Sequence, residues 1–287
     1  MIICVTKGKQ LISCFFIFMM LFTGICSYAM VRANDEEQEI SVPILMYHSI
    51  LKDPNRSGKY VVTPTTLEND MIYLKEHGYE TVLAKDLIAY VYDDKPLPKK
   101  PIVLTFDDGH FNNMVYLLPL LEKYQMKAVI SVVGNYTEQF SQSDGHNPNY
   151  SYLTWEDIKK IEDSGRIEIA NHTYHLHEKS SRKGCSILEG EAVEEYRNHL
   201  KKDLEKLQVA LKEKADIQSS VTFTYPFGYI CPESQKTVEE IGFLASLSCY
   251  ERINQISKNK GCLYSLGRFN RPEGISTEEY MKKIKLP

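Results

Sequence analysis

The chain has little that would direct it toward nucleic acids, thiol chemistry or a nucleophilic serine. Its 287 residues have a formal net charge of −4, which gives no basis for binding a polyanion. None of its seven cysteines has the Cys-x-x-Cys spacing of a zinc or redox site, and no Gly-x-Ser-x-Gly segment occurs. Internal repeats and low-complexity segments are also absent. Any chemistry must therefore be sought among carboxylates and histidines.

The first 30 residues have the pattern of an export segment. Lys7 and Lys9 precede an apolar stretch at 11–30, and Ser27-Tyr28-Ala29 places small residues at the two positions that a signal peptidase reads. The stretch is also long enough to span a bilayer as an uncleaved anchor. We expect an exported protein, secreted or attached to the outer face of the cell membrane. Residues 1–33 are then a signal peptide or membrane anchor, and residues 34–40 are a short acidic linker.

Residues 41–287 are sufficient for one α/β domain. Hydrophobic patterning predicts strands at 42–48, 79–83, 101–106, 127–133, 166–170, 221–225 and 243–248. It predicts helices at 65–77, 85–92, 112–124, 154–163, 189–214, 233–241 and 276–284. Alternation of strands and helices implies a parallel sheet, and polar residues at strand ends fit a barrel. Cys185, Cys231, Cys249 and Cys262 fit either two disulfides, in three pairings, or four thiols.

Two adjacent aspartates, Asp107 and Asp108, are the most informative feature of the chain. They follow the apolar run 102–106, which predicts a strand buried on both faces, and they precede Gly109. Two carboxylates at such a position are costly unless a positive charge lies between them, and a divalent metal is the usual answer. Neighbouring strand residues point to opposite sides, so one can bind metal while the other acts as a base. The alternative is an Asp-Asp-Gly turn with two solvated carboxylates.

Three histidines follow a second short strand. They are His172, His175 and His177, and imidazole is the commonest side-chain metal ligand. Two histidines and one carboxylate, with a position left for water, are typical of catalytic sites. His172 and His175 share a face if the segment is helical, whereas His172 and His177 fit a loop. The residues alone leave this choice open.

The motifs resemble those of the polysaccharide deacetylase family, also called carbohydrate esterase family 4. The matching segments are Thr105-Phe106-Asp107-Asp108-Gly109, the histidine cluster from His172 to His177, and Tyr225-Pro226-Phe227-Gly228. They occur in the family's order, and the resemblance runs from Val42 to the C-terminus. It implies a single-domain α/β fold, a distorted (β/α) barrel of about seven parallel strands. It also implies that Asp107 is the catalytic base and that Asp108, His172 and a second histidine hold a metal ion.

Two departures from the family pattern indicate a particular branch. The five-residue spacing from His172 to His177, and a Tyr-His-Ser strand end around His48, resemble the branch that deacetylates poly-β-1,6-N-acetylglucosamine. That likeness favours His177 over His175. No histidine follows His199, so the usual C-terminal catalytic acid is missing, and the likeness assigns its role to His48. Many members place an arginine just before the Pro-aromatic-Gly segment, and this chain does not, so the likeness leaves open what orients Asp107.

The resemblance predicts a polysaccharide N-deacetylase with one divalent metal ion. We expect Zn²⁺, with Ni²⁺, Co²⁺ or Fe²⁺ as alternatives, because two histidines and a carboxylate suit several ions. We expect the backbone N–H of Phe227 to stabilise the oxyanion, with Tyr225 at the same oxyanion and substrate site. The predicted partner is an N-acetylated glycan, first poly-β-1,6-N-acetylglucosamine, with peptidoglycan or chitin oligomers as alternatives. A monomer is expected, and a non-catalytic carbohydrate-binding relic of the fold is the competing hypothesis.

Overall fold

The computed structural model describes residues 39–143, 145–178, 182–218 and 220–286. The export segment predicted at 1–33, and all but the last two residues of the predicted linker, lie outside these ranges. Within the described ranges, no helix combines the length and the apolar character needed to cross a bilayer. Residues from Ile40 onward form one structural unit.

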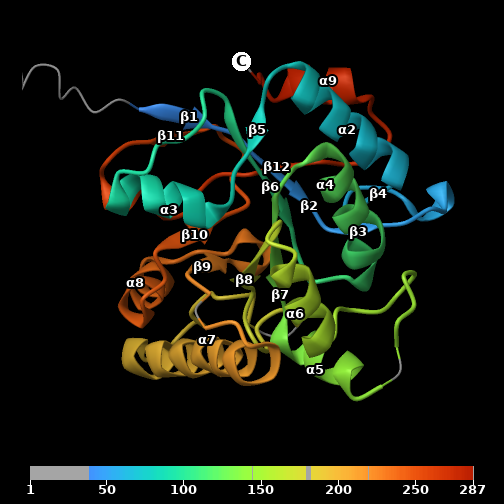
Figure 1. Ribbon diagram of the computed structural model, residues 1–287. Helices are drawn as coiled ribbons and strands as arrows, with labels where there is room; N and C mark the ends of the chain where they lie inside the picture. Colours follow the sequence, from blue (N-terminus) through green and yellow to red (C-terminus); the bar gives the residue numbers. More distant parts are fainter. Residues whose placement is uncertain (1–38, 144, 179–181, 219, 287) are drawn as a thin grey trace, which may run out of the picture. The chain divides into compact units, whose positions relative to one another are not determined.

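The centre of this unit is a curled parallel sheet of seven strands in the order β10, β9, β8, β7, β6, β2 and β12 (Figure 1). In chain order these are β2 (Ile44–Tyr47), β6 (Pro101–Phe106), β7 (Ala128–Val132), β8 (Ile167–Asn171), β9 (Thr222–Thr224), β10 (Ala245–Leu247) and β12 (Phe269–Asn270). An eighth strand, β5 (Glu80–Thr81), pairs in parallel with the start of β6. Leu266, just before β12, forms a parallel bridge with Leu247 in β10. Because β10 and β12 are the two ends of the strand order, this bridge connects those ends. The expected distorted barrel of about seven parallel strands is confirmed.

Smaller elements flank the sheet. Strand β1 (Ile40–Val42) pairs antiparallel with β11 (Asn254–Ile256), and β3 (Ser49–Ile50) pairs in parallel with β4 (Val61–Val62). The short helical turns are η1 (Pro54–Arg56), η3 (Pro226–Gly228) and η4 (Lys260–Leu263), and η2 (Asn113–Leu117) is a π-helical stretch. The chain segment between β3 and β4 and the one following β9 both lie at the carboxyl ends of the central strands, where the candidate site is built.

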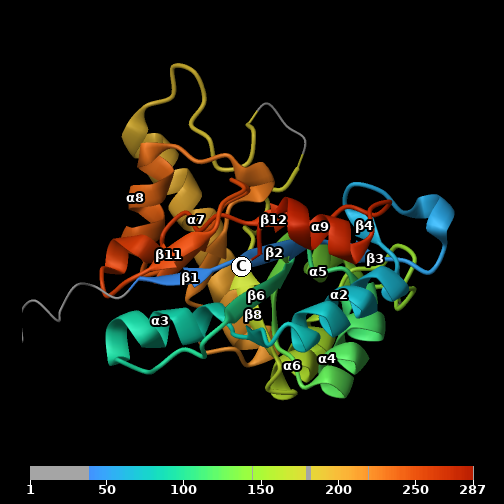
Figure 2. The ribbon, with the colours of Figure 1, turned by 90° about the horizontal axis from the view of Figure 1, so that it is seen from above.

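The helices surround the sheet (Figures 1 and 2). They are α2 (Pro64–Glu76), α3 (Ala84–Asp93), α4 (Leu118–Tyr124), α5 (Gly134–Ser141), α6 (Trp155–Asp163), α7 (Val193–Ala215), α8 (Pro232–Ile241) and α9 (Thr277–Lys283). Helix α7 packs against α6 and α8, and α2 packs against α4 and α9. Helix α6 begins with a capping box in which Thr154 and Asp157 bond each other's backbone N–H groups. The predicted start at Thr154 is therefore confirmed.

The structure differs from the predicted helices at three points. A helix occupies 112–124 as predicted, but it includes the π-helical stretch η2 before α4, where Pro119 lacks the N–H that a continuous α-helix would require. The helix predicted from residue 189 begins at Val193, because Gly190 has a φ of +77° that interrupts it. Val193, the first residue of α7, is exposed, whereas Leu200, Leu204, Leu207 and Leu211 form the buried stripe of this helix. Helix α5 was not expected, because its eight mainly polar residues carry too short a periodic signal.

The thiols also answer an open question. Cys185, Cys231 and Cys249 are free thiols, so the two-disulfide alternative does not describe this structure. Cys185 is fully buried in a cluster with Tyr196, Phe223 and Tyr225, which joins α7 and α8 to the sheet. Burial raises the pKa of the Cys185 thiol well above its usual value, as expected for a packing residue.

Candidate metal and active site

The aspartate pair lies at the carboxyl end of β6, at the centre of the sheet. Asp107 continues the strand ladder, because its N–H donates to the carbonyl of Tyr47 at 3.0 Å. The backbone then turns sharply, with φ of +72° at Asp108 and +71° at Gly109. A side chain at Gly109 would lie 3.0 Å from Val132, so the turn requires glycine for space as well as conformation. The turn separates the two carboxylates and directs them to different partners.

Asp108, His172 and His177 form a three-residue cluster with the ligand types of a metal site. One ligand atom from each lies within 4.8 Å of the other two. The Asp108 Oδ1 atom is 3.6 Å from His172 Nε2 and 3.1 Å from His177 Nε2. This oxygen is buried and has no partner with hydrogen-bond geometry. Three ligand atoms that converge in this way, one of them an unsatisfied carboxylate oxygen, fit a shared divalent cation.

The imidazole of His172 is oriented for a ligand role. Its Nδ1 atom lies 2.7 Å from the carbonyl of Thr224, which can only accept, so Nδ1 carries the proton. The Nε2 atom is then unprotonated in the neutral ring and faces Asp108. Burial acts to raise the pKa of Asp108, but contacts with His110, His172 and His177 outweigh burial and hold that pKa well below its usual value. The carboxylate is therefore charged, as a metal ligand must be.

The histidine segment is a loop held by side chains from two elements. Thr173 has a φ of +72°, and its N–H donates to Asn171 Oδ1 at 2.9 Å. Asp203 on α7 accepts the N–H groups of Tyr174 at 2.7 Å and His175 at 2.8 Å. A carboxylate that accepts two backbone N–H bonds fixes the loop strongly, because both bonds are charge-assisted. The helical alternative for the histidines is therefore excluded.

Two further histidines, His175 and His110, differ in their position relative to the Asp108 cluster. His175 points away from the cluster, half its side chain is exposed, and it lies 3.7 Å from Glu178. His110 lies at the site, with Nε2 3.6 Å from Asp108 Oδ2 and its ring stacked on Tyr152 at 4.8 Å. His177, and not His175, is thus the second histidine that the structure places beside Asp108.

A buried arginine that the sequence did not reveal binds Asp107. Arg268, just before β12, donates from Nη1 and Nη2 to the two Asp107 oxygens at 2.7 and 2.8 Å. A third bond runs from Arg268 Nε to the carbonyl of Ser248 at 2.7 Å. Burial acts to raise the pKa of Asp107, but the guanidinium outweighs it and holds that pKa below its usual value. No sequence motif marks Arg268, which reaches Asp107 only because β12 lies beside β2.

His48 lies on the other side of Asp107. Its Nε2 atom is 4.0 Å from Asp107 Oδ2, and its ring packs on Tyr60 at a centroid distance of 4.8 Å. Burial lowers the pKa of His48 despite the nearby Asp107 carboxylate. A neutral imidazole and a carboxylate are two neighbouring proton acceptors, so a proton that Asp107 takes up can pass to His48.

In the third motif, Tyr225-Pro226-Phe227-Gly228, the side chains of Tyr225 and Phe227 lie in different environments. The Phe227 backbone has a φ of +58°, the residue is 45% exposed, and its ring lies 4.5 Å from the ring of His177. Tyr225 is fully buried and packs on Phe223, on the side of the sheet that faces α7 and α8. The expectation that Tyr225 contacts substrate is therefore wrong for its side chain. Residue alternation along the strand directs it into the core.

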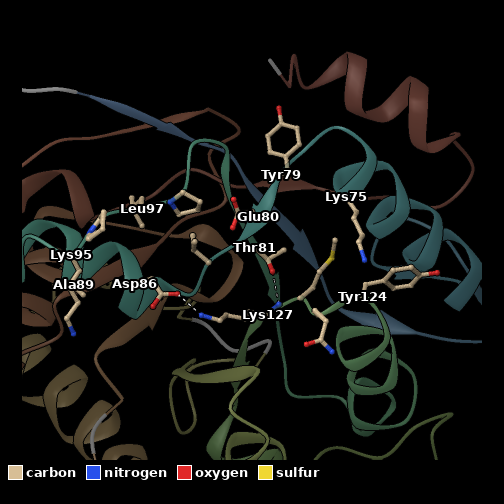
Figure 3. A pocket seen from close by; sticks show the side chains of 15 residues that line it. Lys75, Tyr79, Glu80, Thr81, Asp86, Ala89, Lys95, Leu97, Tyr124 and Lys127 are labelled. Atoms are coloured by element: carbon tan, nitrogen blue, oxygen red, sulfur yellow. Dashed lines mark hydrogen bonds and ion pairs between the residues drawn. The ribbon is translucent and has the colours of Figure 1, made fainter.

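These groups surround one cavity of about 580 Å³, which we call the catalytic cavity. Its lining includes His48, Asp107, Asp108, His172, His177, Phe227, Tyr229 and Cys249. A different cavity of about 530 Å³ lies at the opposite, amino-terminal ends of the strands, around β5 (Figure 3). There Lys127 Nζ lies 3.4 Å from Asp86, and the Lys127 N–H donates to Thr81. That cavity contains none of the predicted site residues.

Fold and site together define a hydrolase-type centre at the carboxyl ends of a parallel barrel, with a two-histidine, one-carboxylate cluster beside a second carboxylate. Residues 94–246 match the family model described as polysaccharide deacetylase, which is more than half of the chain. The chain therefore belongs to the polysaccharide deacetylase family and carries a deacetylase domain.

Named relatives agree with this assignment. The chain is 25% identical over 218 residues to poly-β-1,6-N-acetyl-D-glucosamine N-deacetylase of Escherichia coli (strain K12), which covers 69% of this chain but 32% of that protein. It is 29% identical over 242 residues to YxkH of Bacillus subtilis (strain 168). The matched region is 84% of this chain and 75% of that protein. A de-N-acetylase structure from Aggregatibacter actinomycetemcomitans matches with a TM-score of 0.72 and 23% identity over 85% of this chain and all of that one. The chain thus spans about a third of the E. coli relative, and the structural match supports the fold.

Proposed function

We propose that this protein is a metal-dependent hydrolase that removes N-acetyl groups from an extracellular polysaccharide containing N-acetylglucosamine. The observation that carries the proposal is the convergence of the Asp108, His172 and His177 ligand atoms next to a separate, arginine-bound carboxylate. A pure carbohydrate binder has no need for a second buried carboxylate at this position. The non-catalytic alternative is therefore disfavoured.

The metal would be held by Asp108, His172 and His177, and when bound it would supply Lewis-acid activation of water and of the acetyl carbonyl. Zn²⁺ is our first choice, with Ni²⁺, Co²⁺ and Fe²⁺ as alternatives. Asp107 accepts a proton from the attacking water. Arg268 keeps the Asp107 carboxylate charged and fixes both of its oxygens, so its orientation does not depend on substrate.

The leaving sugar amine requires a proton, because an amide anion is a very poor leaving group. His48 is the group we assign to this step. Burial lowers the pKa of His48, so the resting imidazole is neutral near pH 7. Asp107, once it carries the proton from water, is the neighbour 4.0 Å away that can protonate His48. The Phe227 N–H is our candidate donor to the oxyanion. Phe227 lies in a turn and has a backbone φ of +58°.

Poly-β-1,6-N-acetylglucosamine is the proposed substrate. The five-residue spacing of His172 and His177, the position of His48, and the similarity to the E. coli deacetylase named for this polymer support it. Peptidoglycan and chitin oligomers present the same acetamide and are the alternatives. We also propose export, with residues 1–33 as signal peptide or anchor, 34–40 as linker, and a monomeric domain at 41–287.

The test is acetate release by the full chain from β-1,6-linked oligomers, chitin oligomers and peptidoglycan, with and without a chelator. We expect the first substrate to be preferred and the chelator to abolish release. Asp107→Asn should lower turnover at least about a hundredfold while metal content is retained. Asp86→Asn, in the opposite cavity, is the matched control and should keep activity. Absence of chelator-sensitive acetate release from every substrate would refute the proposal.

A further inference from the structure

The exposed aromatic side chains of the described residues are unevenly distributed. Seven large hydrophobic side chains are exposed, and the two aliphatic ones, Val193 and Val209, lie on α7. The other five are Tyr60, Tyr150, Phe227, Tyr229 and Tyr250. Three of these five line the catalytic cavity, and Tyr250 lies between two residues that do. Exposed aromatic groups gathered at one face mark a binding surface, because they are otherwise unfavourable in water.

The fifth aromatic residue, Tyr150, belongs to a second hollow that opens from the catalytic cavity. This side cavity has a volume of about 330 Å³, within the usual size range of ligand sites. It shares His48, Tyr60 and Asp108 with the catalytic cavity. A ligand that fills both hollows must therefore pass Asp108, the candidate metal ligand that the two linings share.

The walls of the side cavity are held by specific contacts. Arg56, in η1, donates from Nη2 to the carbonyl of Asn149 at 2.9 Å and from Nη1 to its Oδ1 at 3.3 Å. These bonds join the segment between β3 and β4 to the segment before α6. Also in the lining, the ring of His110 stacks on Tyr152, and the two backbones form a bridge. The cavity is thus formed before any ligand arrives, which lowers the entropic cost of binding.

The charges of the lining restrict what the side cavity accepts. Asp108 is the one carboxylate among its lining residues, and it already belongs to the proposed ligand set. Arg56 supplies a positive charge, and Tyr60, Tyr150 and Tyr152 supply aromatic faces and hydroxyl groups. Such a lining suits a neutral sugar ring, whose apolar face packs on an aromatic ring and whose hydroxyl groups find polar partners. A sugar with a free ammonium group would lie near the positive Arg56 without an uncommitted carboxylate partner, because Asp108 belongs to the proposed ligand set.

We propose that the side cavity binds the sugar adjacent to the residue being deacetylated, and that it selects an N-acetylated sugar over a glucosammonium there. The inference rests on the proposed function. It adds a minimum substrate length and the acetylation state of the sugar next to the residue being deacetylated. Tyr150 supplies the stacking surface, and Arg56 and Asn149 supply polar contacts. The enzyme then requires an oligomer and acts first in stretches that are still acetylated on that side.

The experiment compares kcat/KM for a fully acetylated β-1,6-linked N-acetylglucosamine pentamer with kcat/KM for 4-nitrophenyl acetate, using the zinc-loaded full chain. Tyr150→Ala should lower this ratio roughly tenfold, the effect of one lost aromatic contact. Tyr150→Phe retains the ring and is the matched control, whose ratio should stay within about twofold of the unaltered protein. Tyr150 is 64% exposed, so neither substitution threatens the fold.

A second comparison tests the acetylation state. A pentamer carrying one glucosamine next to an acetylated residue should release acetate from that residue more slowly than the fully acetylated pentamer. An unchanged ratio in Tyr150→Ala, or equal rates for both pentamers, would overturn the inference while the deacetylase activity stands. Failure of the metal-loaded protein to release acetate from any oligomer would refute the proposed function, and the inference with it.

Discussion

Replacement of Arg268 by methionine tests how the Asp107 carboxylate is held in the site. Arg268 and Asp107 form a fully buried pair with two charge-assisted hydrogen bonds, at 2.7 and 2.8 Å. Methionine keeps much of the volume but removes the charge and leaves the Asp107 carboxylate uncompensated. Loss of one partner from a buried ion pair destabilises a protein by about 3–5 kcal/mol, because the other charge stays buried without a partner. We expect a loss of this size in the free energy of unfolding at neutral pH.

The pH dependence of this loss has a definite sign. In the native protein the pKa of Asp107 lies below its usual value, so the pair stabilises the fold above the unfolded pKa. That stabilisation disappears as pH falls through the folded pKa. In Arg268→Met, burial loses its main opponent and raises the pKa of Asp107 relative to the unaltered protein, although His172 and His48 still act to lower that pKa, so ionisation stabilises the fold less or opposes it. The difference in the free energy of unfolding between the unaltered protein and Arg268→Met should be largest near pH 7 and should shrink below about pH 4.

The assay is urea unfolding over this pH range, with a chelator present so that metal binding does not contribute. Arg271→Met is the matched control, because Arg271 lies three residues away and forms a similar buried pair with Asp70, at 2.8 and 3.1 Å. Both variants should lose stability, but Arg268→Met should also lose acetate release, whereas Arg271→Met should retain it in the folded fraction. Equal stability of Arg268→Met and the unaltered protein at pH 7, or a pH-independent difference, would refute the reasoning.

The remaining predictions concern the metal ligands and their support. His177→Ala should lose zinc, as measured by metal content after dialysis, whereas His175→Ala should keep it, because His175 points away from Asp108; the opposite pattern would make His175 the ligand. Asp203→Asn should weaken zinc affinity about 10- to 100-fold in competition with a chromophoric chelator, because it weakens the loop's anchor. Unchanged affinity would mean that the histidine loop holds its shape without Asp203.

Much of the fold could be predicted from local pattern. The apolar run predicts a strand at 101–106, and β6 spans those residues, because both faces of a central parallel strand are buried. Boundaries shift where local signals compete, as at Gly190, which delays α7, and Pro119, which divides the helix predicted at 112–124. Short strands such as β12 give no periodic signal at all. Two residues cannot show an alternation, so only pairing with β2 defines that strand.

The sequence by itself determined the chemistry available to this protein: paired carboxylates at a strand end, clustered histidines, and an upstream His48. These are local properties, since a strand end and the turn after it are encoded in a few neighbouring residues. Only the tertiary structure decided which groups meet. It placed Arg268, 161 residues from Asp107 along the chain, against that carboxylate, directed Tyr225 into the core, and selected His177 through a loop bound by Asp203. The physical reason is that contacts between distant segments depend on strand order and side-chain direction, which no local pattern contains.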